Sequence, residues 1–307
     1  MNIASIDIGS NTVLLLIAEL EESTKNFNAI LNRYEAPRLG KGLQSNGNIS
    51  DESITKLLNV LTSYRKIIDE YNSKIILCTA TNAMRVANNS KEIVSKIKAE
   101  LDIDIEIITG EKEAELSFLG ASTVLPGAEN KMVMDIGGGS TEIILGNDNE
   151  IYYKKSFPYG AVNLTEEFIH NEIPTKVEIE SLEKFIRKSF SELLSIVTPS
   201  VPLIAVAGTP TSLSAANLGL RDYDESLVEG SVLSINDLEK FILEFSSLSP
   251  SDILNKYGNI LSGREDVILA GSLILKTVSE LTTNKKIFVS GRGIRYGSVI
   301  QFIRNNF

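Results

Sequence analysis

Two short stretches of this chain combine a carboxylate, glycines and hydroxyl side chains in the same order. The first is Asp7-Ile8-Gly9-Ser10-Asn11-Thr12, and the second is Asp135-Ile136-Gly137-Gly138-Gly139-Ser140-Thr141-Glu142. Glycine permits positive φ angles and lets a ligand approach the backbone closely. Successive N–H groups in such a turn form an anion-binding concavity. The two stretches therefore predict a pair of loops that grip a polyphosphate from both sides.

The carboxylates of these stretches could hold a hard cation. Asp7 and Asp135 occupy equivalent strand ends, and Glu142 follows the second loop. Oxygen ligands completed by substrate phosphates suit Mg²⁺, which keeps several of its waters. We therefore expect Mg²⁺, with Mn²⁺ as the alternative ion. Capping of the turn is the alternative role for each aspartate.

Glu113 is a candidate general base. It lies in a predicted helix that begins near Thr109, on the same stripe as Leu116 and Gly120. That stripe points towards the core or a cleft, where a carboxylate loses hydration and becomes a stronger base near neutral pH. The alternative is a first-turn glutamate that interacts with the helix dipole.

Three arginines and one further glycine turn are candidate phosphate ligands. Arg85 ends a small, polar stretch that leaves a buried strand, and Arg38 lies in a glycine-rich loop. Arg264 stands at a predicted helix start, where a surface ion pair is the strongest alternative. A guanidinium pairs with phosphate oxygens through two parallel hydrogen bonds. Gly208 and Thr209 follow another strand, with Thr209 predicted as the N-cap of a helix.

Several other chemistries are excluded. No Gly-Lys-Ser/Thr follows either glycine turn, so neither is a Walker loop. The chain leaves each turn as a strand, whereas a dinucleotide fingerprint opens a helix. His170 is the only histidine, and a catalytic triad or a histidine metal cluster would depend on it alone.

Bulk composition is that of a globular protein. The chain has 307 residues, is 43% hydrophobic and carries a net charge of −10, which argues against nucleic-acid or membrane binding. A phosphate site must then depend on local cations, backbone amides and a metal ion. No apolar run approaches the length of a membrane span, and no cleavable leader is visible. Because Cys78 is the only cysteine, no intrachain disulfide forms, and we expect a cytoplasmic protein.

The elements that must position these residues alternate between strands and helices. Each glycine turn joins two strands, and a break at Pro126-Gly127 separates two α/β halves. We expect domains at 1–124 and 125–307, with a last helix near 297–307 packing back on the first. Further strands are predicted at 28–34, 74–79, 105–108, 151–156, 203–207 and 286–289. Further helices are predicted from residue 51, at 82–87, 91–101 and 164–170, from a Thr175/Glu178 capping box through Leu193, and at 236–245 and 265–281.

The motifs resemble the exopolyphosphatase/guanosine pentaphosphate phosphatase (Ppx/GppA) family in its short, two-domain form. The two glycine stretches match in family order and the resemblance covers essentially the whole chain. The Asp135–Glu142 string is the most specific match. The other matching stretches are Thr81-Asn82-Ala83-Met84-Arg85, Gly110–Leu116, Pro158–Thr165, Ala207-Gly208-Thr209 and Arg264–Ile268.

The resemblance implies an α/β fold and a set of roles. The family has two ribonuclease-H-like domains of the actin and sugar-kinase superfamily, with an interdomain active-site cleft and, by our expectation, a homodimer. It places the catalytic base at Glu113, metal-associated carboxylates at Asp135 and Glu142, and an arginine at the substrate at Arg85. Its phosphate loop matches Gly137, Gly138, Gly139, Ser140 and Thr141. To these we add, from the residues themselves, Asp7 as a metal ligand and the phosphate ligands Ser10, Asn11, Thr12, Arg38, Gly208, Thr209 and Arg264.

The expected activity is Mg²⁺-dependent hydrolysis of a terminal phosphoanhydride of inorganic polyphosphate. Hydrolysis of guanosine pentaphosphate (pppGpp) is the nearest alternative, since it would use the same apparatus. A kinase of the same superfamily would need an acceptor pocket in place of a base aimed at water. A non-catalytic sensor of a phosphorylated alarmone is the alternative from a different functional class.

Overall fold

The computed structural model describes residues 1–197 and 201–307, which form two compact units. Unit 1 comprises residues 1–120 and 294–307, and unit 2 comprises residues 121–293. Residues 121–124, expected in the first domain, therefore belong to unit 2, and the last helix belongs to unit 1. Within 1–197 and 201–307, no helix is long and apolar enough to cross a membrane.

Unit 1 contains a five-stranded mixed sheet in the order β3-β2-β1-β4-β5. Its first three strands are antiparallel, whereas β4 and β5 run parallel to β1. The strands are β1 (Asn2–Ile8), β2 (Val13–Glu21), β3 (Asn26–Glu35), β4 (Ile75–Ala80) and β5 (Glu106–Ile107). The helices are α1 (Leu43–Asn46), α2 (Asp51–Glu70), α3 (Asn82–Val86), α4 (Ser90–Leu101), α5 (Gly110–Ala121) and α14 (Ile294–Asn306).

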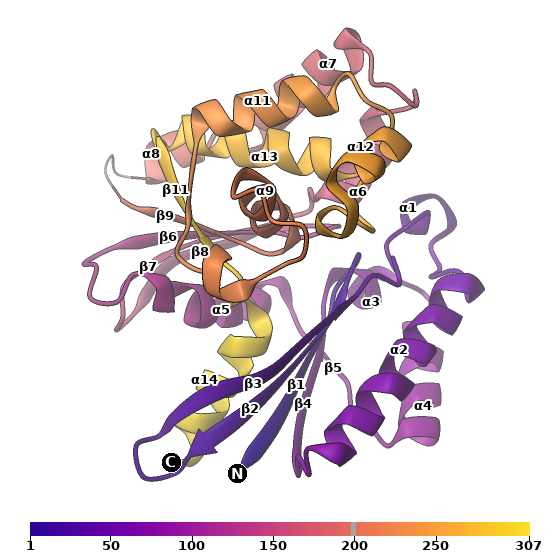
Figure 1. Cartoon of the computed structure of the whole chain (residues 1–307), viewed down its shortest axis with the longest axis vertical. Coiled ribbons are helices and arrows are strands. Elements are labelled where there is room, and N and C mark those ends of the chain that lie inside the picture. Colours follow the sequence, from indigo (N-terminus) through magenta and orange to yellow (C-terminus); the bar gives the residue numbers. More distant parts are fainter. Residues whose placement is uncertain (198–200) are drawn as a thin grey trace. The chain divides into compact units, whose positions relative to one another are not determined.

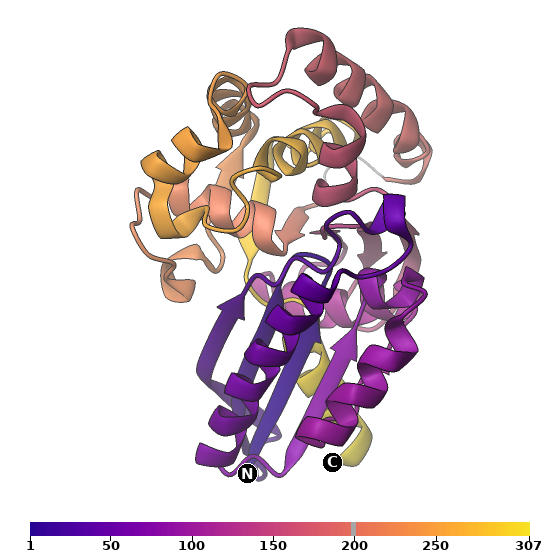
Figure 2. The same ribbon diagram turned by 90° about the vertical axis from the view of Figure 1, so that its right-hand side faces the viewer.

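Helices cover both faces of this sheet. Figures 1 and 2 show α2 and α4 against one face and α14 against the other. Alternate β2 residues serve the two faces, because Leu15 and Ile17 pack with α2 and α4 while Leu16 packs with α14. Ser50 is the N-cap of α2, since its side chain accepts a hydrogen bond from the Ser53 N–H.

Unit 2 contains a six-stranded mixed sheet in the order β10-β11-β9-β6-β7-β8. The helices α7, α11 and α13 lie over it in Figure 1, above one continuous core. The strands are β6 (Lys131–Ile136), β7 (Thr141–Gly146), β8 (Ile151–Phe157), β9 (Leu203–Val206), β10 (Val232–Ser234) and β11 (Lys286–Ser290). The helices are α6 (Ala161–Phe168), α7 (Lys176–Ser189), α8 (Leu193–Ile196), α9 (Gly208–Asn217), α10 (Glu225–Val228), α11 (Ile235–Phe245), α12 (Pro250–Tyr257) and α13 (Ile268–Leu281), with 3₁₀ turns at η1 (Ser122–Val124) and η2 (Gly258–Ile260).

The two sheets share one topology. In unit 2 the order β8-β7-β6-β9-β11 repeats the order β3-β2-β1-β4-β5 of unit 1, and β10 adds an antiparallel edge strand. Each glycine turn joins the first two strands of its unit. The α/β, ribonuclease-H-like fold expected from the resemblance is therefore confirmed.

Strand register brings the candidate loops of each unit to one sheet edge. In unit 1, Ile8 pairs with Ala80, and Ala80 pairs with Ile107, so three parallel strands end together. In unit 2, Asp135 pairs with Val206, which pairs with Ser290. Loops that follow the carboxyl ends of parallel strands lie at the same edge, where ligands bind in open α/β sheets.

Several local predictions were wrong. Thr209 is not an N-cap, because α9 begins at Gly208 and its cap is Ala207. His170 lies beyond α6, which ends at Phe168. The helix that opens at the Thr175 capping box is confirmed at its start but ends at Ser189, and Leu193 begins a separate short helix. The elements α10, β10 and α12 were not predicted at all.

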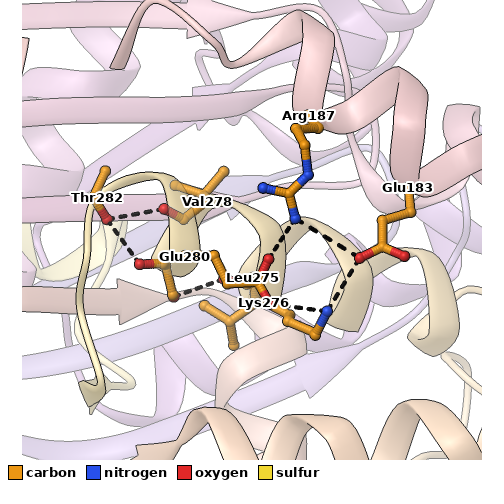
Figure 3. Close-up of polar contacts among 8 residues, drawn as sticks. Glu183, Arg187, Leu275, Lys276, Val278, Glu280 and Thr282 are labelled. Carbon is orange, nitrogen blue, oxygen red and sulfur yellow. Dashed lines mark hydrogen bonds and ion pairs between the residues drawn. The ribbon is translucent and has the colours of Figure 1, made fainter. Parts of the chain in front are cut away.

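An ion-pair cluster joins α7 to α13 in unit 2 (Figure 3). Lys276 Nζ lies 3.1 Å from Glu183 Oε1 and 2.9 Å from Glu280 Oε1, and Arg187 also pairs with Glu280. Burial opposes ionisation of Glu280, but the hydrogen bonds from Lys276 and Arg187 outweigh it and lower the pKa of that carboxyl. The cluster therefore stabilises the contact between the two helices at neutral pH.

Lys276→Met should destabilise the protein because Glu183 and Glu280 lose the lysine that they share, while Arg187 lies 3.9 Å from Glu183 Oε1. We expect the free energy of unfolding at pH 7 to fall by about 1–2 kcal/mol. The folded pKa of Glu280 is depressed, so its contribution is present above the ordinary value of 4.5 and is lost as the pH falls through the folded pKa. Urea denaturation at pH 7 and pH 3 checks this, with the exposed Lys184→Met as control. Equal stability of the two variants at pH 7 would contradict it.

Candidate functional site

The first glycine turn follows β1 in unit 1. The Gly9 N–H donates to the Thr12 carbonyl at 2.8 Å and closes the turn. Ser10 and Asn11 are buried, and Asp7 lies one residue before the strand end. A Cβ on Gly9 would meet the Thr12 carbonyl oxygen at 3.1 Å, so glycine suits this tight turn.

The loop that carries Arg38 is bound to this turn through its backbone. The Arg38 N–H donates to the Asn11 carbonyl at 3.1 Å, and the Gly40 N–H donates to the Ser10 carbonyl at 2.7 Å. Arg38 has a φ of 60°, which is uncommon for a residue with a side chain. Ser53 Oγ donates to the Arg38 carbonyl at 3.2 Å. The structure thus joins predicted residues Ser10, Asn11 and Arg38.

Glu113 and Arg85 form an ion pair in the same unit. Arg85 Nη1 lies 3.1 Å from Glu113 Oε2 and also donates to the Ile108 carbonyl at 2.8 Å. Glu113 is only 5% exposed, as its place on the inward stripe of α5 predicts. The guanidinium neutralises a carboxylate that would otherwise be costly to bury, and it fixes the direction of that carboxylate.

The second glycine turn, in unit 2, lies against the N-terminus of α6. The Gly137 N–H donates to the Ser140 carbonyl at 2.9 Å, in the same way as Gly9 donates to Thr12. A Cβ on Gly160 would lie 2.5 Å from the Gly138 carbonyl carbon, so the two backbones touch. Thr141, a predicted phosphate ligand, is buried and donates through Oγ1 to the Tyr159 carbonyl at 2.7 Å. Its hydroxyl therefore holds the segment before α6.

Two buried carboxylates face each other across β6 and β7. Asp135 pairs directly with Glu142 in the strand register, and their residues are 6% and 0% exposed. Ser156 Oγ donates to Glu142 Oε1 at 2.6 Å. Like charges at opposite ladder positions destabilise a sheet unless a cation or a proton intervenes.

This donor pair fits a hard divalent ion. Both side chains of the pair offer carboxylate oxygens, the ligands that Mg²⁺ and Mn²⁺ prefer. Across 1–197 and 201–307, no group of three or more His, Cys, Asp or Glu residues could hold a metal. Substrate phosphates and water would therefore have to complete the coordination of any ion bound here.

A third turn in unit 2 brings Arg264 to the start of α9. A Cβ on Gly208 would collide with the Arg264 guanidinium, so the arginine lies directly against this glycine. Thr209 is buried in the first turn of α9 and lies close to Gly271 of α13. Because a helix N-terminus favours anions, the guanidinium and the first N–H groups of α9 suit one phosphate group.

Ala207 has a strained backbone at this turn. Its φ of 80° and ψ of −170° fall in a region that is essentially reserved for glycine. Such strain clusters at functional sites. The Ala207 carbonyl accepts a hydrogen bond from Thr211 Oγ1 at 2.8 Å, which helps to hold the turn.

Three features of these sites could not be predicted from the sequence. Asn163 was part of a matching stretch, but its hydrogen bonds to Gly139 and Pro158 had no sequence signal of their own. The left-handed conformations of Arg38 and Ala207 were equally invisible, since neither residue is glycine. Each half of the predicted site is assembled within its own unit. Arg38, Arg85 and Glu113 accompany the first turn, whereas Asp135, Glu142, Gly208 and Arg264 accompany the second.

Duplicated glycine turns on ribonuclease-H-like sheets, with arginines and buried carboxylates at the same edges, define a class of α/β phosphate-handling proteins. A model of the Ppx/GppA phosphatase family matches residues 16–306. The chain therefore belongs to the Ppx/GppA phosphatase family.

Curated relatives include a bifunctional 3-dehydroquinate synthase/phosphatase of Fusobacterium nucleatum, which is 33% identical over 98% of this chain. The chain spans 46% of the length of that protein. Exopolyphosphatase 2 of Mycobacterium tuberculosis is 29% identical, over 90% of this chain and 89% of its own length.

Solved structures of similar proteins have the same fold as this chain. A Ppx/GppA family member from Aquifex aeolicus superposes with a TM-score of 0.84 at 30% identity, covering 100% of this chain and 99% of that chain. An exopolyphosphatase from Cytophaga hutchinsonii superposes with a TM-score of 0.91 at 27% identity, covering 99% and 98%.

Ala207→Gly should stabilise the protein because glycine adopts the strained conformation without steric cost. We expect the free energy of unfolding to rise by about 1 kcal/mol, the strain released being partly offset by the entropy of glycine in the unfolded chain. Urea denaturation measures it. The matched control is Ala205→Gly in β9, which should lower stability by about 1 kcal/mol. A loss in both variants would show that Ala207 carries no relievable strain.

Proposed function

We propose that this protein is an exopolyphosphatase, which hydrolyses the terminal phosphoanhydride of inorganic polyphosphate and releases orthophosphate. The observation that carries the proposal is the buried Glu113, held by Arg85 at the same sheet edge as a glycine turn. A buried, fixed carboxylate beside an anion-binding turn suits activation of water next to a phosphate. Membership of the Ppx/GppA phosphatase family and the mycobacterial exopolyphosphatase relative support the same chemistry.

In the proposed reaction, water attacks the terminal phosphorus and Glu113 accepts a proton from that water. The P–O bond to the next phosphate breaks, and the shortened chain leaves with the bridging oxygen. Phosphoryl transfer depends mainly on positioning and electrostatic stabilisation. Arg85 fixes Glu113 Oε2, so the carboxylate keeps one direction while the proton moves.

The glycine turns and arginines would bind the phosphates. We propose that each turn binds phosphate through its backbone N–H groups, with the guanidinium group of Arg38 as a further donor in unit 1 and that of Arg264 as a further donor in unit 2. Asp135 and Glu142 would hold Mg²⁺ or Mn²⁺ in unit 2. Asp7 is the proposed metal ligand of unit 1. When bound, this ion would neutralise charge that develops on the transferred phosphoryl group.

A comparison of substrates tests the proposed function. Phosphate release is measured side by side on short polyphosphate, long polyphosphate and pppGpp, at saturating Mg²⁺. We expect kcat/KM to be at least about tenfold higher for a polyphosphate, which corresponds to about 1.4 kcal/mol of transition-state preference. A reversed ratio would assign the protein to pppGpp hydrolysis, and tight binding without turnover would assign it to the sensor class.

Glu113→Gln should abolish most of the activity because glutamine keeps the shape of the side chain and cannot accept the proton. We expect kcat to fall about 10²–10⁴-fold, with KM within about threefold of the parent. Steady-state phosphate release measures both constants. The matched control is Glu111→Gln, which changes an exposed glutamate of the same helix. Turnover of Glu113→Gln within threefold of the parent would show that Glu113 is not the base.

A further inference from the structure

The two glycine turns are held by the same pattern of hydrogen bonds, although the donors differ between the units. In both turns the first glycine N–H donates across to the carbonyl three residues on. The carbonyls of the two residues between this glycine and that acceptor also accept hydrogen bonds. Their donors come from the segment that follows the third strand of each unit. In unit 1 this segment is the Arg38–Gly40 loop, and in unit 2 it is the start of α6 with Asn163.

The correspondence extends to individual hydrogen bonds. Ser10 in unit 1 matches Gly138 in unit 2, and their carbonyls accept from the N–H groups of Gly40 and Val162, both at 2.7 Å. Asn11 matches Gly139. The Asn11 carbonyl accepts from the backbone N–H of Arg38, whereas the Gly139 carbonyl accepts from a side chain, Asn163 Nδ2, at 3.0 Å.

Asn163 is therefore a side-chain donor in a position that unit 1 fills with a backbone N–H. Its Nδ2 also donates to the Pro158 carbonyl at 3.1 Å, and its Oδ1 accepts from the Gly160 N–H at 2.7 Å. The amide thus bridges the segment before α6 and the glycine turn. The Ala161 N–H completes the set by donating to the Gly137 carbonyl at 2.9 Å.

Peptide geometry gives these bonds a consequence for binding. In a trans peptide the C=O and the following N–H point in opposite directions. With the carbonyls of Gly137, Gly138 and Gly139 bound on the α6 side, the N–H groups of the next three residues are directed to the other side. A row of N–H groups directed alike is what an anion-binding turn requires.

We propose that Asn163 is a positioning residue, which fixes the Gly139–Ser140 peptide so that its N–H points at a phosphate oxygen of the substrate. The proposal rests on the proposed function for the identity of the substrate, but the orientation of the peptide does not depend on turnover. Glycine has no side chain to restrain its backbone. The second turn contains three glycines in succession, so it depends more than the first turn on hydrogen-bond donors from a neighbouring segment to fix its conformation.

Asn163→Asp is the sharpest test. Aspartate keeps the acceptor for the Gly160 N–H, removes both donated hydrogen bonds and places a carboxylate beside two carbonyls. The matched control is Asn147→Asp, the same change in the β7–β8 hairpin, where Asn147 Oδ1 only accepts from backbone N–H groups. Both variants add one negative charge to unit 2.

Three measurements are made on the full chain. With tripolyphosphate saturating both variants, so that the N–H groups of the turn have an acceptor, amide hydrogen exchange compares the peptide over 137–140 with the peptide over 164–168 of α6. Calorimetry measures the Kd for tripolyphosphate, and phosphate release measures kcat and KM. For Asn163→Asp we expect exchange about tenfold faster in 137–140 alone, a Kd raised about tenfold and kcat/KM lowered about 10–100-fold. The control should stay within twofold of the parent in all three.

Each outcome decides the proposal. Unchanged exchange in 137–140 overturns it, and so does faster exchange throughout α6, because Asn163 would then act by stabilising the helix. If Asn163→Asp does not fold, Asn163→Ser replaces it, since serine is too short to bridge to the Gly139 carbonyl. If the parent protein hydrolyses neither polyphosphate nor pppGpp, the proposed function fails, while exchange and tripolyphosphate affinity still decide the role of Asn163.

Discussion

Parallel pairing of a central strand with its neighbour brings the glycine turn of each unit beside the next candidate segment. The β1–β4 register sets the first glycine turn beside the segment that leads to Arg85, and the β4–β5 register adds the start of α5 with Glu113. In unit 2 the β6–β9 register sets the second turn beside Gly208. A slip of one residue would turn every side chain of a strand to the opposite face. The chemistry thus depends on backbone pairing deep in each core.

Positive groups close to the candidate site allow an acidic protein to bind the proposed anionic substrate. The chain carries a net charge of −10, yet backbone N–H donors and arginines lie at the places where we propose that phosphate binds. Arg85 is shared with the buried Glu113, and Arg264 lies on a glycine at a helix N-terminus. Screening limits the reach of the overall charge to about 10 Å at moderate salt, so the nearest groups decide the affinity.

Much of the fold could be predicted because its signals are local. Alternating apolar residues and glycine turns located both hairpins, and the apolar stripe from Ile54 located α2. The misses have physical causes. The segment after β9 has a Thr-Pro pair that is typical of a helix start, but the strained Ala207 begins the helix earlier. The strand β10 has only three residues, and it exists because β11 offers an edge, which no local pattern reveals.

For the candidate site, too, local sequence signals predict some features and tertiary contacts decide the others. Residue type and spacing predict Glu113, Asp135 and the glycine turns as site residues, since these carry a chemical signature in sequence. What holds them is set by tertiary contacts. Arg38 reaches the first turn through its backbone N–H at a positive φ, and Asn163 reaches the second through its side-chain amide. The two turns can therefore keep the same conformation although different residues fix them, because the constraint acts on carbonyl oxygens and any well-placed N–H donor satisfies it.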